Sequence, residues 1–292
     1  MVRILVCLSV LGSSLTAPAD VLFEGYSKIY SGGVHVGFVV NRYEFDAKKK
    51  QFISLSLLKT GALGGNITES LKAYAKEDMT PISYEYRTLV NGAPKLIDAK
   101  FTGGKILASI TEGKKVSKVD KVMPKGTFLS TFLIYVMLKS PKGLGPDTKY
   151  DYQAIAEEDA EIVKGMAYIK SQETQNGIQT FKILNDFKGT KFVSFVTKEG
   201  QILSTKSPVQ SISTELVPLS SMATAGQQMP SASMREIFGE VPLGVTNEIS
   251  KRYQNNPKGF QTNEDSSPSS TGAPAVAPAL APSAPAANEK HE

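Results

Sequence analysis

Histidine chemistry is confined to one position in the body of the chain. The chain has two histidines, His35 and His291, and His291 lies in an Ala/Pro-rich C-terminal segment. Any Ser-His-Asp arrangement must therefore use His35. Its neighbours Val34 and Val36 belong to the opposite face of a strand, so His35 faces solvent if the valines face the core. Two histidines at metal-ligand spacing do not exist, and we predict no catalytic residue, no metal site and no cofactor.

Four carboxylates lie close together between two strand-like segments. They are Glu157, Glu158, Asp159 and Glu161. Paired acids can hydrolyse glycosides or bind calcium, but the spacing is not that of an EF-hand, and we expect a solvated loop. The Gly-rich run 61–65 lacks the Lys-Ser/Thr pair that follows a phosphate-binding loop, which favours a wide hairpin turn.

The charge pattern does not favour nucleic acid as a partner. The chain carries a net charge of +5, from 33 basic and 28 acidic residues, and no basic run follows one helix or stripe. The densest cluster, Lys48 to Lys50, follows Asp46 at a predicted hairpin tip. We interpret it as a solvated turn, with binding to an anionic surface as the alternative.

The N-terminal residues resemble a secretory signal peptide. Arg3 provides a positive charge, residues 4–15 are mostly apolar, and residues 17–19 supply an Ala-x-Ala site. The segment is too short to span a bilayer, which requires roughly 20 apolar residues. We therefore expect cleavage after Ala19 and a periplasmic or secreted protein without a transmembrane span. Cys7 is the only cysteine, so the mature chain would have no thiol for nucleophilic, redox or metal chemistry.

Turn-forming residues recur at short intervals before residue 218 and predict a β-meander. Asn91-Gly92 and Gly103-Gly104, for example, separate segments rich in Val, Ile, Phe, Tyr and Thr. Residues 82–90 alternate, with Tyr84 and Tyr86 on one face of the strand. We expect roughly twelve strands and a mainly β fold, a curved antiparallel sheet that is open or forms a half barrel.

One apolar segment, Phe128–Leu138, breaks this pattern, and Thr127 precedes it as a predicted cap. Its length favours a helix buried against the concave face of the sheet, although a buried central strand satisfies the same pattern. One helical face either fills the core or lines an apolar cavity between helix and sheet. The candidate ligand-binding residues on this segment are Phe128, Leu129, Phe132, Leu133, Tyr135 and Val136.

Beyond Pro218 the pattern changes again. Residues 233–236 resemble a capping box that opens a short helix, and Thr246–Tyr253 is a second helical candidate. From Gln261 onward the chain is rich in Ala, Pro and Ser and has too few large apolar groups to order itself. The predicted units are a signal peptide (1–19), a β-rich domain (20–225), a short helical extension (226–253) and a disordered tail (254–292).

Two short motifs add a resemblance. Gly33–Gly37 is a Gly-x-x-x-Gly element in a strand pair, and Glu199-Gly200 forms the turn of a later hairpin. Together with the signal peptide, they resemble a group of uncharacterised bacterial periplasmic domains over residues 20–225. This group is similar to the curved, open sheets of lipoprotein-carrier and lipocalin-like proteins, with a helix in the concavity. The resemblance implies that fold and assigns no catalytic residue.

The leading hypothesis is a non-enzymatic periplasmic binding or carrier protein that holds an apolar or lipid-like ligand under the segment 128–138. The alternative is an envelope interaction or scaffolding protein, whose sheet surface or Pro-rich tail contacts an envelope protein or cell-wall partner. An enzyme is the third hypothesis, and it would require His35 in a pocket beside a Ser or Thr and a carboxylate.

Overall fold

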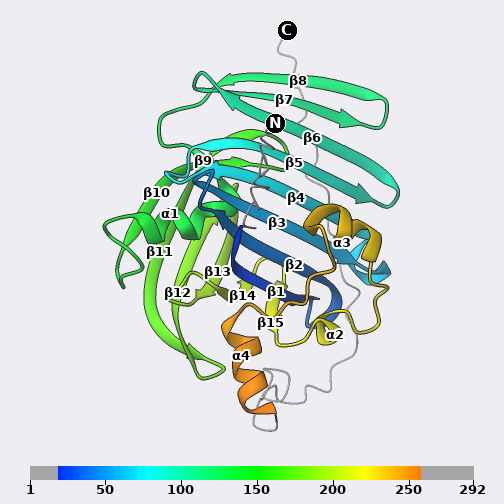
Figure 1. Cartoon of the computed structure of the whole chain (residues 1–292), viewed down its shortest axis with the longest axis vertical. Helices are drawn as coiled ribbons and strands as arrows, with labels where there is room; N and C mark the ends of the chain where they lie inside the picture. Colours follow the sequence, from blue (N-terminus) through cyan, green and yellow to red (C-terminus); the bar gives the residue numbers. More distant parts are fainter. Residues whose placement is uncertain (1–18, 258–292) are drawn as a thin grey trace, which may run out of the picture.

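Fifteen strands form one sheet in the computed structural model, which describes residues 19–257 (Figure 1). The strand order is β8-β7-β6-β5-β4-β3-β2-β1-β15-β14-β13-β12-β11-β10-β9, so the first eight strands form a meander. Neighbouring strands are antiparallel except for β9 and β10, which are parallel. The sheet is open, because the terminal strands β8 and β9 are not paired with each other. The predicted mainly β, open architecture is therefore confirmed, with one parallel pair added.

The strands are β1 (Asp20–Ser31), β2 (Val34–Asp46), β3 (Gln51–Thr60), β4 (Ile67–Lys76), β5 (Pro81–Val90), β6 (Ala93–Thr102), β7 (Lys105–Glu112), β8 (Lys115–Val122), β9 (Phe128–Leu129), β10 (Lys149–Ala156), β11 (Glu161–Gln175), β12 (Ile178–Phe187), β13 (Thr190–Val196), β14 (Ile202–Ser207) and β15 (Ile212–Val217). The helices are the 3-10 turns η1 (Ala62–Gly64) and η2 (Ser130–Phe132), and α1 (Leu133–Lys139), α2 (Ser220–Ala223), α3 (Ser231–Phe238) and α4 (Glu248–Asn255).

Two-residue turns set the register of the meander. Asn91-Gly92 joins β5 to β6, and Gly103-Gly104 joins β6 to β7. All four residues have positive φ, 49° and 83° in the first turn and 57° and 73° in the second. Positive φ at both central residues is typical of type I′ turns, whose twist matches that of the flanking strands. These turns therefore determine which side chains lie on each face of the sheet.

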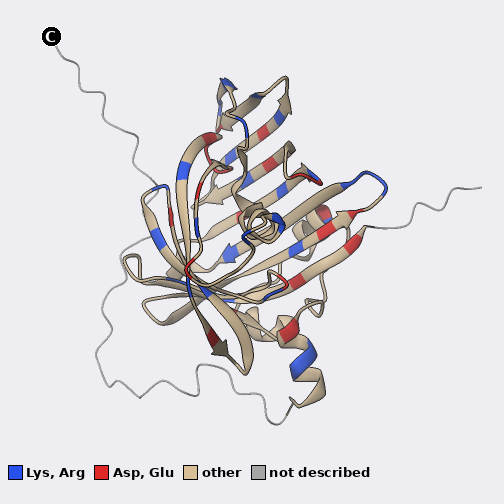
Figure 2. Cartoon of the chain, turned by 90° about the vertical axis from the view of Figure 1, so that its left-hand side faces the viewer, with Lys and Arg blue, Asp and Glu red and all other residues tan. Residues whose placement is uncertain are grey.

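The sheet curves around η2 and α1. Met137 of α1 packs with Ile169 of β11 and Ile183 of β12. Phe132 of η2 packs in one cluster with Ala73 of β4. Because these strands lie far apart in the strand order, contact with both requires a curved sheet, and Figure 2 shows this curvature from the side. We call the side that holds η2 and α1 the concave face, and the opposite side the convex face.

The apolar segment 128–138 is α-helical only in its second half. Its first two residues form β9 and pair with Ala154 and Ile155 of β10. The 3-10 turn η2 follows, and α1 begins at Leu133. The predicted helix is therefore confirmed as an α-helix from Leu133 to Leu138, is replaced by a 3-10 turn in η2, and is wrong for Phe128 and Leu129, which form a strand. A short run of apolar residues that is buried on all sides is compatible with both a strand and a helix, so its hydrophobic periodicity does not distinguish the two.

Neither predicted side-chain cap is present. Thr127 precedes β9, and its buried hydroxyl has no hydrogen-bond partner among residues 19–257. The helix α3 begins at Ser231, two residues before Ser233, and no side chain caps it. The helix α4 is capped by Asn247, whose Oδ1 accepts a hydrogen bond of 2.8 Å from the Ser250 amide. The two C-terminal helices thus form near the predicted positions, with ends that the short motifs did not locate.

The C-terminal helices pack against different parts of the sheet. Met234 and Phe238 of α3 share a core cluster with Phe38 and Leu57 on the convex face. In α4, Ile249 belongs to a separate cluster with residues of β14 and β15. The segment 218–255, which we call the C-terminal segment, therefore adds to the hydrophobic core.

A buried ion pair joins the sheet to this C-terminal segment. Arg42 of β2 donates from Nε to Glu24 of β1 over 2.6 Å, and both residues are only 5% exposed. Arg42 also contacts Glu240 at 2.9 Å. The other Glu24 carboxylate oxygen accepts a 2.5 Å hydrogen bond from the Gly244 amide, and its carbonyl accepts a 2.8 Å bond from Asn247. The buried polar atoms of this ion pair thus have hydrogen-bond partners within the protein, which replace the water lost on burial.

No helix within the described range 19–257 is long and apolar enough to span a membrane. Apart from Ala19, the predicted signal peptide lies outside this range. The predicted tail also lies outside it, apart from residues 254–257, and the first two of these four residues belong to α4. Cleavage, export and disorder of the tail remain predictions.

Arg42→Ala should lower the free energy of unfolding by about 3–5 kcal/mol, because Glu24 would stay buried without its cation. Arg87 is a matched control, since it bridges Glu85 and Glu236 at 2.7 Å each but has a half-exposed side chain. Arg87→Ala should cost less than about 1 kcal/mol. Chemical denaturation of both variants measures the difference, and equal losses would contradict the structural role of the buried pair.

Candidate functional site

The predicted ligand-binding residues separate into two groups. Phe128 is 4% exposed, and Leu129 and Phe132 are fully buried within the main hydrophobic cluster. The second group, Leu133, Tyr135 and Val136, is only partly buried and packs against the same cluster. The first group fills the core between the two arms of the sheet, which are strands β2 to β8 on one side and strands β9 to β12 on the other. Only the second group has surface available to a ligand.

Tyr135 lies among other aromatic rings of the concave face. Its ring centroid is 5.2 Å from that of Tyr43 and 5.6 Å from that of Phe52. The apolar surface continues beyond α1 onto the far strands of the meander. Partly buried side chains there include Phe101 of β6, Ile110 of β7 and Val119 of β8. The concave face thus carries a continuous set of apolar side chains that the chain itself covers only in part.

Glu157 is buried beneath this surface, which corrects the expectation of a solvated acidic loop. It is 5% exposed, and its carboxylate accepts hydrogen bonds from the Ser130 hydroxyl at 2.5 Å and the Thr131 amide at 3.1 Å. Burial raises the pKa of Glu157 to about 7, against the lowering effect of these two donors. Three buried apolar residues, Ala154–Ala156, precede it and are the sequence feature that indicates an inward-facing turn.

The neighbouring acids have a different role from Glu157. Glu158 contacts the Lys188 ammonium at 2.8 Å, and Asp159 forms a second ion pair with the same group. Both carboxylates are partly buried, and Glu161 is exposed. The expected solvent exposure therefore holds for Glu161, although this residue begins β11, and it is wrong for Glu157, because the turn between β10 and β11 packs into the concavity.

Polar contacts hold η2 between the two arms of the sheet. On the side of β2 and β3, the Thr131 hydroxyl bonds to the Ser54 hydroxyl at 2.8 Å, and the Tyr43 hydroxyl donates to the Thr131 carbonyl at 3.2 Å. On the opposite side, Glu157 accepts from Ser130 and Thr131. The 3-10 turn is thus fixed by both arms, and it positions α1.

A tyrosine hydroxyl in the same region has no partner within the described residues. Tyr84 is 2% exposed and its hydroxyl is buried without a hydrogen bond. Burial raises its pKa, as do the charges of Glu157 and Asp159. On the next strand, burial likewise raises the pKa of Glu69, and the adjacent Tyr86 hydroxyl opposes this. The interior of the concave face therefore combines apolar surface with groups that can donate or accept hydrogen bonds.

His35 lies apart from this region. It is partly buried rather than fully exposed, its ring is 5.8 Å from that of Tyr30, and its Nε2 hydrogen-bonds the Gly37 carbonyl at 2.9 Å. These contacts do not include a Ser or Thr hydroxyl or a carboxylate. Within residues 19–257, no group of three or more His, Cys, Asp or Glu side chains is placed to hold a metal ion.

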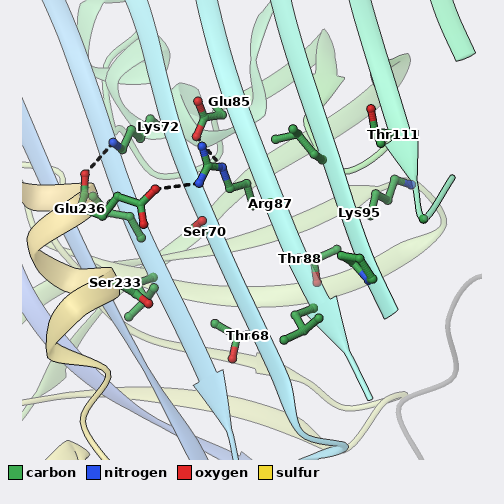
Figure 3. Close-up of a pocket in the computed structure, with 16 residues that line it drawn as sticks. Thr68, Ser70, Lys72, Glu85, Arg87, Thr88, Lys95, Thr111, Ser233 and Glu236 are labelled. Atoms are coloured by element: carbon green, nitrogen blue, oxygen red, sulfur yellow. Dashed lines mark hydrogen bonds and ion pairs between the residues drawn. The ribbon is translucent and has the colours of Figure 1, made fainter. Parts of the chain in front are cut away.

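The convex face carries a groove that the sequence analysis did not predict. It lies between α3 and strands β4 to β6, has a volume of about 380 Å³ and is shown in Figure 3. Its apolar lining includes Leu57, Leu89, Leu96 and Ile237. A second depression, of about 740 Å³, lies over the convex side of β4 to β8. Both are on the opposite side of the sheet from α1.

Charged side chains at the first groove are largely paired with each other. Arg87 contacts Glu85 and Glu236 at 2.7 Å each, and Lys72 donates to the Glu236 carbonyl at 2.7 Å (Figure 3). These contacts attach α3 to the sheet. A ligand in this groove would have to compete for the same cations, which makes the groove the weaker candidate site.

Comparison with known proteins finds a distant similarity to two solved structures. No family model and no curated protein matches it. A β-barrel-like protein of the domain of unknown function DUF1849 from Brucella abortus is 13% identical, with a TM-score of 0.44, covering 68% of this chain and 98% of that one. A DUF1089 family protein from Pseudomonas aeruginosa is 11% identical, with a TM-score of 0.33, covering 70% and 97%. Both are families of unknown function, and membership of a periplasmic family remains a prediction.

The pKa of Glu157 predicts a pH-dependent stability. Because folding raises this pKa from 4.5 to about 7, the folded state binds the proton more tightly than the unfolded state. The free energy of unfolding should therefore fall as the pH rises through this window, by up to about 1.4 kcal/mol per pH unit. Urea denaturation across the window should show the fall, and Glu157→Gln should flatten it.

Glu158→Gln is the control for this experiment, because Glu158 lies on the same turn and is paired with Lys188. This variant should keep the fall in stability. An unchanged slope in Glu157→Gln would show that another group causes the pH dependence.

The two groups of predicted residues should respond differently to truncation. Phe132→Ala empties a fully buried position and should lower the free energy of unfolding by about 3–5 kcal/mol. Tyr135→Ala removes a partly exposed ring and should cost only roughly 1–2 kcal/mol. Chemical denaturation tests this order, and a larger loss for Tyr135→Ala would assign Tyr135 to the core.

Proposed function

We propose that this protein is an exported, non-enzymatic binding or carrier protein that holds an apolar or lipid-like ligand on the concave face of its sheet. The observation that carries the proposal is the partly exposed apolar surface that extends from α1 onto β6, β7 and β8. Apolar surface that remains open inside a curved sheet is the usual location of such a ligand.

The lining that we propose differs from the one expected at first. Phe128, Leu129 and Phe132 are core residues, so they support the site without touching a ligand. The ligand would lie between the partly buried face of α1 and the strands opposite. The proposed lining residues are Leu133, Tyr135, Val136, Phe101, Ile110 and Val119.

Polar groups at the inner side of this surface favour a ligand with a polar end. The Tyr84 hydroxyl has no partner among residues 19–257, and a buried hydroxyl gains stability when it acquires one. Glu157 carries a raised pKa close by, so its carboxyl group exchanges a proton near neutral pH. A fatty acid or another amphiphile with a hydroxyl or carboxyl head satisfies both features.

Native mass spectrometry of the exported protein, purified without detergent, tests the proposal. We expect an added mass that organic extraction removes and that is identified as lipid. An apo mass, with no uptake from an added lipid extract, would reject the carrier function and leave the concave surface as incomplete core packing.

Charge substitutions on the two faces of one strand locate the ligand. Val119→Asp introduces a charge on the concave side of β8 and should weaken retention of an added fatty acid at least about 10-fold. Val116 lies on the opposite side of the same strand and is 60% exposed, so Val116→Asp should leave retention unchanged. Leu89→Asp places the same charge in the convex groove. Loss of retention with Leu89→Asp alone would move the site to that groove.

A further inference from the structure

The positive charge of this protein is concentrated at one edge of the sheet. Residues 100–125 comprise the end of β6, all of β7 and β8, and the turn after β8. They contain seven lysines and only two acids, Glu112 and Asp120. The remaining 266 residues contain 26 basic and 26 acidic side chains. This segment, which we call the lysine-rich rim, therefore carries the whole net charge of +5.

Most of the rim lysines are exposed and unpaired. Lys105 pairs with Asp120 at 3.0 Å, and Glu112 pairs with Lys95 outside the rim at 3.1 Å. The side chains of the other six have no ion-pair or hydrogen-bond partner within residues 19–257, and all six residues are exposed. They are Lys100, Lys114, Lys115, Lys118, Lys121 and Lys125. Both acids of the rim are thus already neutralised, and the free lysines give it a strong positive potential.

Exposed valines lie among these lysines. Val116 is 60% and Val122 74% exposed, and both point to the convex side of β8. Lysines on a terminal strand are a common protection against edge-to-edge pairing. That role does not explain Lys114 and Lys125, which lie in turns, and it gives no reason for large exposed valines at the same edge.

We propose that the lysine-rich rim docks on the surface of an anionic lipid bilayer. The rim is the free edge of the sheet, because β8 has no neighbour beyond it, and Figure 1 shows β7 and β8 at one end of the molecule. Side chains from both faces of a terminal strand reach outward, so lysines on either face contact the same plane. Anionic headgroups bind the ammonium groups, and the valines enter the interfacial layer. This proposal does not depend on a ligand in the concavity.

Co-sedimentation with vesicles of phosphatidylcholine, with and without phosphatidylglycerol, tests the docking. The full exported chain should bind only the anionic vesicles, and added salt should release it. A variant with Lys114→Gln, Lys118→Gln and Lys121→Gln should lose about 100-fold in partitioning, since each lysine near an anionic surface contributes roughly fivefold. The same three positions changed to Arg should retain binding.

The lysine run on the turn between β2 and β3 supplies the matched control. Lys48, Lys49 and Lys50 are exposed, and their replacement by Gln removes the same charge from another part of the sheet. This control should bind like the unaltered chain. Equal losses in the two triple variants would show non-specific attraction, and an unaffected rim variant would show that the rim takes no part. Either result overturns the proposal.

The valines distinguish a bilayer from a soluble polyanion. Val116→Ser with Val122→Ser should weaken vesicle binding several-fold and leave binding to dextran sulfate unchanged, because only a bilayer offers apolar depth. Unchanged vesicle binding by this variant, or rim-dependent binding to dextran sulfate alone, would overturn the bilayer as the partner. Circular dichroism of each variant confirms that the fold is retained, as expected for exposed positions.

Discussion

An open sheet buries apolar side chains only where another segment packs on it, and this constraint organises the whole structure. Both faces of β2 and β3 have to be covered, and two short segments do so. On the concave side, η2 and α1 fill the space between the two arms of the sheet. On the convex side, α3 covers β2 and β3. The strands beyond these segments are progressively more exposed, and most of β8 is in contact with solvent.

Polar groups fix both covering segments at a precise position. Hydrophobic packing alone is not directional, so short helices on a broad sheet need other contacts to set their orientation. Arg42 and Glu24 supply these on the convex side, and Glu157 supplies them to η2 on the concave side. Each buried charge has a desolvation cost that its partners must offset. The two arrangements differ in that Arg42 neutralises Glu24, whereas Glu157 has only neutral donors, and burial raises the pKa of Glu157 to about 7.

The local pattern of the sequence predicts the strands well and the long-range contacts poorly. Alternation places Tyr84 and Tyr86 on a buried face, and both are buried. Paired turn residues locate the hairpins, because positive φ is a property of the turn itself. In contrast, β9 is a strand only because the edge of β10 offers it two pairing positions. From the sequence alone, Arg42 and Glu24 are typical of the solvent-exposed face of a strand. They are buried because residues 238–247, far along the chain, pack over them.

Both proposals rest on the part of the sheet that no other segment covers. Strands that extend beyond the covering helices add little to stability, and a long uncovered edge strand is prone to pair with other chains. Here β6 to β8 extend past the cover, apolar on the concave side and lysine-rich along the edge. The apolar residues of this extension face α1, and the unpaired lysines surround its rim. Apolar side chains inside and ammonium groups along the edge follow the same order of polarity as a lipid monolayer, so one extension of the sheet carries the features on which both proposals rest.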